Sequence, residues 1–299
     1  WKYDELGRGV LSTHPDDAGK VSLSYGDGYT DVADAFGRTS RYITELRDGI
    51  AMVTEVRGPG CGVCGAGDVR YRYNERLQVT DAIPRSGIGT HHTYDGLGRL
   101  IETAQSVQGG KRSWQARFVY EGTSLHASRI ERPSINPDGV HSLEFAYTED
   151  GQVLTVTERG YTPTRDGAFA SIERTLGAAY DAAGRMVAVD GPRAGTIDLT
   201  RLEYDAAQRL VATIDADGIE QRVVSYDAAG RPTRLRRTGS PDLELRYDSI
   251  GRLTMLIEHR SSGEQVKSFA YDAAGRALSI SRPDGSVQKL GRDRAGRIN

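Results

Sequence analysis

Two cysteines in the short segment Cys61-Gly62-Val63-Cys64 are the residue types best suited to chemistry in this chain. Two thiols separated by two residues are typical of half a structural zinc site or of a redox-active pair. The chain has no other cysteine, and the nearest histidines are His91 and His92. Because adjacent residues of a strand point to opposite faces, only one histidine could join the thiols, and His91 is our candidate.

Three interpretations of Cys61 and Cys64 stay open on the sequence alone. The pair could lie in a Gly-rich surface loop, as a local disulfide or as free thiols. It could instead be two inert, half-buried thiols. It could also bind a metal ion together with His91 or with another part of a longer protein.

The carboxylates offer little for catalysis. General acid–base chemistry needs two carboxylates that converge across a cleft, whereas Asp215, Asp217 and the pair Glu149-Asp150 fall in segments typical of turns. Asp217-Gly218 could bind calcium only by analogy with loop sites, since no EF-hand pattern surrounds it. No serine lies in a G-x-S-x-G context. We therefore expect no enzymatic activity and no cofactor.

Charge and hydropathy exclude two classes of partner. The chain has 39 Lys and Arg against 41 Asp and Glu, a net charge of −2, so we expect no nucleic-acid partner. A short basic cluster at Arg234-Leu235-Arg236-Arg237 is interpreted as a solvated strand face. No apolar stretch approaches the roughly 20 residues that a transmembrane helix needs, so we expect no membrane span.

A six-residue motif, Tyr-Asp-x-x-Gly-Arg, recurs along the chain at intervals of 21 to 24 residues in the second half. One copy, Tyr204 to Arg209, has Gln208 in place of the glycine. Earlier copies include residues 3–8, 33–38 and 94–99. The motif residues of the four clearest copies are Tyr180, Asp181, Gly184 and Arg185, then Tyr226, Asp227, Gly230 and Arg231, then Tyr247, Asp248, Gly251 and Arg252, and finally Tyr271, Asp272, Gly275 and Arg276.

Each motif residue has a local role in a hairpin turn. The aspartate accepts a hydrogen bond from the backbone two residues on, and the glycine supplies a positive φ, as a loop with a bulge requires. Gln208 should therefore make its turn strained or differently shaped. The flanking residues alternate as in half-buried strands: Leu253, Met255 and Ile257 are expected on one face. A second Asp/Gly turn between motifs completes a strand–turn–strand–turn repeat.

Such hairpins cannot bury their apolar faces alone, so neighbours must add edge to edge. Glycine is abundant, with 36 residues, and tyrosine outnumbers phenylalanine by 15 to 5, which suits short, half-buried strands. We predict an all-β fold of tandem antiparallel β-hairpins in one continuous, spiralling sheet. Tyr and Leu should line one face and charged residues the other. Residues 1–299 should form a single array, clearest over 180–299, with a Cys/Gly-rich insertion at 57–68.

On these motifs the chain resembles the RHS/YD-repeat family: bacterial Rhs polymorphic toxins, the shell component of Tc insecticidal toxin complexes, wall-associated repeat proteins and teneurins. The resemblance implies a large hollow, barrel-like β-shell. In toxin members that shell encloses a C-terminal effector, which an aspartate-based self-cleavage at a core-ending segment releases. This chain stops at Asn299 while still repeating, so we expect an internal fragment and assign no cleavage residue.

The resemblance makes an encapsulating toxin scaffold the leading functional hypothesis. Its partners would be the rest of its own shell, an encapsulated C-terminal toxin domain, and a secretion-apparatus spike or a chaperone. The location would be secreted or at a bacterial cell surface, with no signal visible in this fragment. The alternative is a surface adhesion or carbohydrate-binding module, in which Tyr25, Tyr29, Tyr42 and Trp114 would stack on glycans.

Overall fold

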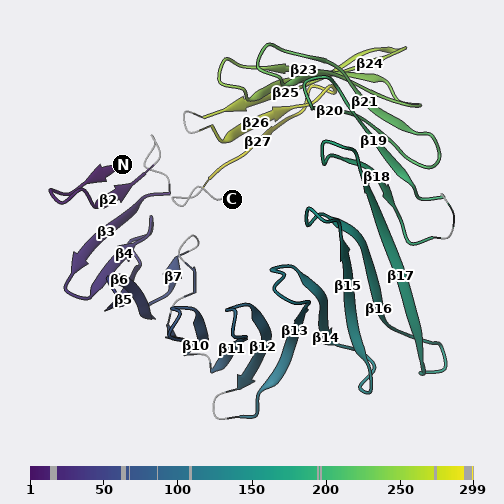
Figure 1. Ribbon diagram of the computed structural model, residues 1–299. Helices are drawn as coiled ribbons and strands as arrows, with labels where there is room; N and C mark the ends of the chain where they lie inside the picture. Colours follow the sequence, from purple (N-terminus) through teal and green to yellow (C-terminus); the bar gives the residue numbers. More distant parts are fainter. Residues whose placement is uncertain are drawn as a thin grey trace. The chain divides into compact units, whose positions relative to one another are not determined.

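The computed structural model describes the chain except residues 14–18, 62–64, 67, 86, 108–109, 194, 196, 273–274, 293–297 and 299, and except the side chains of residues 60–61 and 65–66. All regular structure in the described part is β-strand (Figure 1). Twenty-five strands belong to one sheet, and β7 and β8 form a separate two-stranded sheet. The predicted fold class, tandem antiparallel hairpins in a continuous sheet, is confirmed. None of the described residues forms a helix long and apolar enough to cross a membrane.

The strands have the following bounds. The first half of the chain contains β1 (Lys2–Tyr3), β2 (Gly9–Ser12), β3 (Val21–Gly26), β4 (Tyr29–Ala33), β5 (Thr39–Arg47), β6 (Ile50–Arg57), β7 (Gly60–Cys61), β8 (Gly65–Ala66), β9 (Val69–Tyr73), β10 (Val79–Pro84), β11 (Ile88–Tyr94), β12 (Leu100–Val107), β13 (Ser113–Tyr120), β14 (Ala127–Pro133) and β15 (Val140–Tyr147). The second half contains β16 (Val153–Pro163), β17 (Phe169–Tyr180), β18 (Met186–Asp190), β19 (Thr200–Tyr204), β20 (Leu210–Ile214), β21 (Glu220–Tyr226), β22 (Pro232–Arg237), β23 (Asp242–Tyr247), β24 (Leu253–Arg260), β25 (Gly263–Tyr271), β26 (Ala277–Ser281) and β27 (Val287–Lys289).

The chain folds into two compact units. Unit 1 comprises Trp1–Ser142, Gly160–Ala170 and Arg292–Asn299, and unit 2 comprises Leu143–Arg159 and Ser171–Gly291. In unit 1, β1 to β6 and β9 to β14 pair in chain order, each antiparallel to the next. In unit 2, β17 to β27 pair in the same way. That all 299 residues form a single array stays a prediction.

The segment between Arg57 and Val69 is not part of this series of paired strands. Strand β6 ends at Arg57, β9 begins at Val69, and the two strands pair directly through Val56 and Val69. The intervening residues carry the small β7–β8 hairpin, in the stretch that the sequence marks as an insertion.

Most motif turns are accompanied by a bulge, which corrects one prediction. Arg246 pairs with Met255 and Tyr247 pairs with Leu253, so one residue of β24 between these pairs has no partner. Because directly paired residues share a face and Arg246 and Tyr247 point to opposite faces, Leu253 and Met255 also lie on opposite faces. The expectation that Leu253, Met255 and Ile257 share a face was therefore wrong, since an unpaired residue shifts the alternation.

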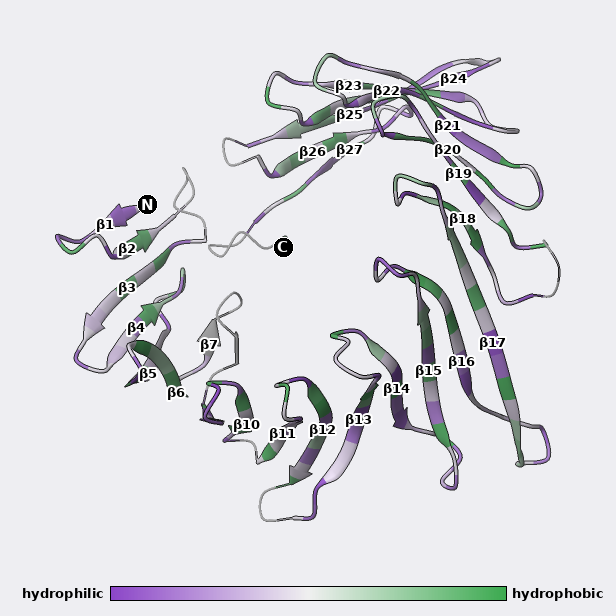
Figure 2. Ribbon diagram, in the orientation of Figure 1, coloured by the Kyte–Doolittle hydropathy of each residue, from purple (hydrophilic) through white to green (hydrophobic). Residues whose placement is uncertain are grey.

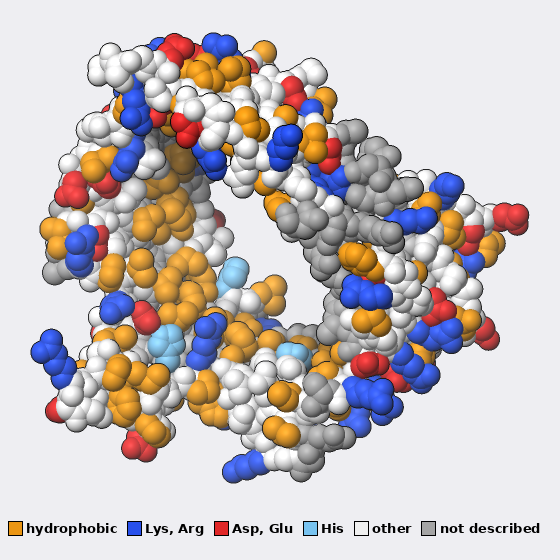
Figure 3. Space-filling view, turned by 180° about the vertical axis from the view of Figure 1, so that it is seen from behind, with side chains coloured by type: hydrophobic (Ala, Val, Ile, Leu, Met, Phe, Trp, Pro, Cys, Tyr) orange, Lys and Arg blue, Asp and Glu red, His pale blue; other side chains and the backbone are white. Residues whose placement is uncertain are grey.

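Burial is shallow throughout the described chain, as expected of half-buried strands. Hydrophobic and hydrophilic residues are interleaved along the strands (Figure 2). The buried hydrophobic residues in the described part are few and mostly small: Val32, Val56, Val69, Ala104, Ala212 and Ile257. Figure 3 shows hydrophobic side chains gathered into a patch over unit 2, on the left of that view. In each unit the described strands thus form a single-layered sheet, and apolar side chains remain on its surface.

Candidate functional site

The motif builds a turn closed by its own aspartate. Asp227 Oδ1 accepts hydrogen bonds from the backbone N–H groups of Ala229 (3.0 Å) and Arg231 (2.9 Å). The Asp227 N–H donates to the Arg231 carbonyl (2.9 Å), and the Gly230 N–H donates to the Asp227 carbonyl (3.0 Å). Gly230 has a φ of 78°, in the left-handed region that favours glycine. The predicted roles of the aspartate and the glycine are both confirmed.

The second aspartate oxygen holds the arginine at the end of the motif. Arg231 Nε donates to Asp227 Oδ2 at 2.6 Å. The pKa of the Asp227 carboxyl lies below its ordinary value, chiefly because the Arg231 backbone N–H donates to it, and the Arg231 side chain adds to this against the opposing effect of desolvation. The same ion pair recurs in other copies: Asp4–Arg8, Asp34–Arg38, Asp95–Arg99, Asp181–Arg185, Asp205–Arg209, Asp248–Arg252 and Asp272–Arg276.

The same arginine also contacts the next repeat. Arg231 Cζ lies 4.8 Å from the centroid of the Tyr247 ring, a cation–π contact. The Tyr247 hydroxyl donates to the carbonyl of Pro232, the residue that follows Arg231 (2.9 Å). The pairing of an arginine with the tyrosine of the following repeat is found again for Arg8–Tyr25, Arg99–Tyr120, Arg185–Tyr204, Arg209–Tyr226 and Arg252–Tyr271. We call this series of contacts the inter-repeat ladder.

Every tyrosine of the inter-repeat ladder bonds an equivalent carbonyl. The acceptor is always the residue immediately after the stacked arginine. The further bonds are Tyr25 to Gly9, Tyr120 to Leu100, Tyr204 to Met186, Tyr226 to Leu210 and Tyr271 to Leu253.

Worn copies of the motif keep the contact by other means. Gln78 stands where the arginine would be, and its Nε2 donates to the Gly98 carbonyl of the next motif (2.7 Å). Gln152 does the same toward Gly184 (2.6 Å). Glutamine is uncharged, so these junctions keep the hydrogen bond but lose the ion pair. A hydrogen bond from this position to the next motif therefore does not require a charged donor.

Gln208 shows what the glycine position requires. It adopts a φ of 67°, in the left-handed region where a Cβ is disfavoured. Its N–H still donates to the Asp205 carbonyl (3.0 Å), and Asp205 Oδ1 accepts from Ala207 and Arg209 as in the glycine-containing turns. The prediction of strain agrees with this φ, while the turn keeps the common hydrogen-bonding pattern.

Sequence reasoning placed the motif residues in turns but missed their contacts between repeats. The signal was available: tyrosine and arginine stand at the two ends of the clearest motif copies, and the spacing of 21 to 24 residues sets each tyrosine two strands after the preceding arginine. A long donor and an aromatic ring at a fixed repeat spacing indicate a contact along the array.

The candidate metal residues are not brought together in the described part. Cys64 and the side chain of Cys61 lie outside the described residues. His91 Nδ1 is 2.6 Å from Asp81 Oδ1, and His91 Nε2 is 2.7 Å from Ser106 Oγ. Both ring nitrogens are thus engaged, and among described residues no cluster of three His, Cys, Asp or Glu fits a metal ion. A site with the cysteines stays an untested prediction.

The aromatic residues considered for glycan stacking are already covered on one side. Arg8 Cζ lies 4.3 Å from the Tyr25 ring centroid, Arg41 Cζ 3.9 Å from that of Tyr29, and Arg117 Cζ 4.6 Å from that of Trp114. Burial raises the pKa of the Tyr42 hydroxyl. These residues are built into the sheet.

Two arginines of the basic cluster of β22 pair with one aspartate of the next strand. Arg234 Nη2 lies 2.9 Å from Asp242 Oδ2, and Arg236 Nε lies 3.2 Å from Asp242 Oδ1. Asp215 closes a turn through its carboxylate, accepting from Asp217 and Ile219. Turn formation thus accounts for this carboxylate, as expected.

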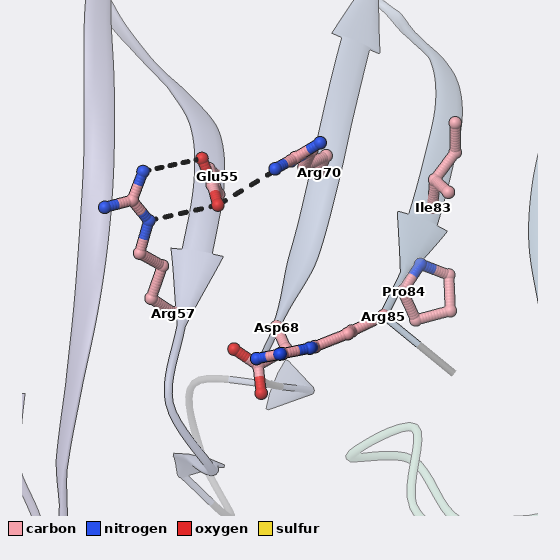
Figure 4. Close-up of a pocket in the computed structure, with 7 residues that line it drawn as sticks. All are labelled: Glu55, Arg57, Asp68, Arg70, Ile83, Pro84 and Arg85. Atoms are coloured by element: carbon pink, nitrogen blue, oxygen red, sulfur yellow. Dashed lines mark hydrogen bonds and ion pairs between the residues drawn. The ribbon is translucent and has the colours of Figure 1, made fainter. Parts of the chain in front are cut away.

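A groove of about 580 Å³ in unit 1 is lined by Glu55, Arg57, Asp68, Arg70, Ile83, Pro84 and Arg85. Figure 4 shows Arg57 and Arg70 on two sides of Glu55. Arg57 Nε lies 3.0 Å from Glu55 Oε1, and Arg70 Nε 3.6 Å from the same oxygen. Both arginines lower the pKa of Glu55, Arg57 more strongly. The groove is polar, and its apolar part is at Ile83 and Pro84.

The comparison with protein families agrees with this architecture. The family model described as RHS Repeat matches residues 180–221 and 204–242, which contain three copies of the motif, one of them with Gln208 in place of the glycine. Residues 180–242 therefore match the RHS repeat. This confirms the resemblance drawn from the Tyr-Asp-x-x-Gly-Arg motif.

One toxin and several solved structures are also similar to this chain. The chain is 27% identical over 204 residues to double-stranded DNA deaminase toxin A of Burkholderia cenocepacia (strain H111), a match covering 65% of this chain and 13% of the relative. The crystal structure of TcdB2-TccC3-TEV matches with a TM-score of 0.61 at 15% identity, covering 99% of this chain and 19% of that one. A Photorhabdus luminescens Tc holotoxin pore matches with a TM-score of 0.58 at 14% identity, with the same two coverages. The chain therefore shares the fold of these two structures and spans less than a fifth of each of the three proteins.

Proposed function

We propose that these RHS repeats are a section of the wall of a bacterial toxin shell, which encloses a C-terminal effector and delivers it. The observation that carries the proposal is the inter-repeat ladder in a sheet with the fold of TcdB2-TccC3. The wall itself works by exclusion, keeping an enclosed chain from its target, and that role requires no enzymatic chemistry.

A wall one sheet thick must resist opening between repeats. Each junction already has the backbone hydrogen bonds of an antiparallel pair. The inter-repeat ladder adds a tyrosine hydrogen bond and a cation–π contact, together about 1 to 2 kcal/mol per junction. Because the contacts recur from Arg8–Tyr25 to Arg252–Tyr271, this reinforcement runs along both units.

One face of unit 2 offers an apolar surface. The pairs Val223–Leu235 and Leu235–Leu243 place these three side chains on the same face of the sheet. They border a hollow of about 450 Å³. An apolar surface of this kind favours contact with an unfolded or partly folded chain, whose own apolar residues are exposed. This supports an enclosed polypeptide as the partner.

The proposal includes further parts that these residues do not contain. The rest of the shell would close the wall, and a secretion-apparatus spike or a chaperone would take part in delivery. The protein would then act outside the cell that makes it or at that cell's surface. The named toxin among the relatives supports this setting for the RHS repeats.

The test is intact mass spectrometry of the full-length protein from its own source, under native and denaturing conditions. We expect one mass in the native spectrum and two in the denatured spectrum, the second being a C-terminal piece held inside the wall. A single uncut chain in both spectra, with no protease-protected C-terminal segment, would overturn the proposal and favour surface adhesion.

A further inference from the structure

Three side chains on adjacent strands of unit 1 form a continuous hydrogen-bonded series. They are Asp81 on β10, His91 on β11 and Ser106 on β12. Asp81 pairs directly with His91, and Gly89, two residues before His91, pairs directly with Ser106. Directly paired residues share a face, as do residues two apart on a strand. The sheet register alone therefore sets all three side chains on one face.

The distances are those of good hydrogen bonds in both links. Asp81 Oδ1 lies 2.6 Å from His91 Nδ1, and His91 Nε2 lies 2.7 Å from Ser106 Oγ. A carboxylate only accepts, so Nδ1 carries a proton, and in the neutral imidazole Nε2 is then the nitrogen that accepts the serine proton. Asp81 is held in turn by Thr80 Oγ1, which donates to Oδ2 (3.0 Å), and by Arg112 (3.5 Å).

His91 is buried at 8% relative exposure, whereas Ser106 is only half-buried. A buried base beside a reachable hydroxyl is the arrangement that nucleophilic catalysis needs. Gly89 lies beside both groups, since a Cβ there would be in van der Waals contact, at 3.5 Å, with His91 Nε2 and with Ile83 Cγ1. Ile83 is also part of the lining of the 580 Å³ groove. The groove therefore adjoins the series on the same strand, β10.

We propose that Ser106 is an activated nucleophile that accepts the acyl group of carboxylic esters, with His91 as general base and Asp81 positioning the imidazole. Ser106 Oγ bonds to the carbonyl carbon while its proton passes to His91 Nε2. The bond between that carbon and the alcohol oxygen breaks, and the alcohol leaves with the proton from His91. Water then attacks the acyl-serine by the same route, which releases a carboxylic acid and restores Ser106.

The chain contains a matched control on the opposite face. His92 follows His91 and so points the other way, and its Nδ1 lies 3.2 Å from Thr103 Oγ1. This pair also joins a histidine to a hydroxyl between β11 and β12. Within the described part of the chain, the His92 ring bonds to this hydroxyl and to no carboxylate. Any reactivity due to a histidine near a hydroxyl in this sheet would appear at Thr103 as well.

The experiment is labelling of the whole chain with a fluorophosphonate probe, which forms a stable bond to activated serines, followed by peptide mass mapping. Release of p-nitrophenol from p-nitrophenyl acetate is measured in parallel. We expect the adduct on Ser106 and its loss in Ser106→Ala. Asp81→Asn should slow labelling by about 100-fold, the scale of general-base assistance. Thr103→Ala and His92→Gln should label like the unsubstituted chain.

Adducts spread over exposed serines, or no adduct at all, would overturn the proposal, as would unchanged labelling in Asp81→Asn. The adduct map of the unsubstituted chain decides the matter even if Ser106→Ala fails to fold. Circular dichroism of each variant separates loss of structure from loss of reactivity. The result is independent of the shell function, because no enclosed effector takes part in it.

Discussion

The Arg231 guanidinium lies over the ring of Tyr247, 16 residues further along the chain and in the next repeat, with a Cζ-to-centroid distance of 4.8 Å. The same guanidinium is bonded to Asp227 in its own turn (2.6 Å). One side chain thus links the conformation of a turn to the junction with the next repeat. A change at Arg231 should therefore weaken both at once.

Arg231→Lys keeps the charge but removes the planar fork that reaches Asp227 and covers Tyr247. We expect the urea midpoint to fall by an amount equivalent to about 1 to 2 kcal/mol. Arg246→Lys is the matched control, since Arg246 is 57% exposed and pairs with Glu244 on its own strand. It should cost less than about 0.5 kcal/mol. Equal losses in the two variants would contradict a special role of Arg231.

Tyr247→Phe removes only the hydroxyl that donates to the Pro232 carbonyl (2.9 Å). We expect a loss of about 1 kcal/mol and faster amide hydrogen exchange in β22 and β23. Tyr247→Leu removes the ring beneath Arg231 as well and should lose more. If the two variants exchange alike, the ring adds nothing to the junction. If the amides of Tyr247→Phe exchange at the same rate as those of the unsubstituted chain, the hydroxyl adds nothing to the stability of the junction.

The turns and the strand class could be predicted from the sequence because their causes are local. Asp227 and Gly230 act within one turn, and each residue type has a specific backbone role there. Strand faces were harder to predict. The alternation fails across the bulge between Tyr247 and Leu253, since one unpaired residue reverses the face of every residue after it.

The series Asp81–His91–Ser106 could not be predicted from the sequence, for a different reason. No sequence pattern joins the three residues, and serines were set aside because none lies in a G-x-S-x-G context. Their meeting depends on the register of β10, β11 and β12, and β10 carries a register shift just before Asp81. A shift of one residue in either pairing would send a member to the other face.

Gln208→Gly should stabilise the chain. Gln208 has a φ of 67°, and left-handed backbone costs a residue with a Cβ roughly 1 kcal/mol relative to glycine. The reverse change, Gly230→Ala, imposes that cost on a turn with a φ of 78° and should destabilise by a similar amount. Thermal unfolding of each variant measures both shifts.

Gly96→Ala is the control for this pair. Gly96 belongs to a motif copy but has no positive φ, and a Cβ there would meet nothing within 4 Å. We expect the free energy of unfolding of this variant to stay within about 0.5 kcal/mol of that of the unsubstituted chain. Destabilisation at Gly96 as large as at Gly230 would mean that the cost arises from the motif in general and not from the left-handed backbone.

Acid should unfold the array through the motif aspartates. The pKa of Asp181 is lowered from 3.8, chiefly by the hydrogen bond from the Arg185 side chain. The pKa values of Asp205 and Asp248 are also lowered, chiefly by hydrogen bonds from backbone N–H groups. A lowered pKa in the folded state adds stability above the unfolded pKa, and this stability is lost as the pH falls through the folded value. Many weak, exposed groups act together here, so the loss should be steep and confined to pH below about 4. Circular dichroism between pH 7 and pH 2 would follow this loss of structure.

Asp227→Asn should lower stability at pH 7 and flatten the acid transition slightly, because an amide cannot be protonated there. An acid transition centred near pH 6 would point to histidines instead, and would show that the motif carboxylates do not control it.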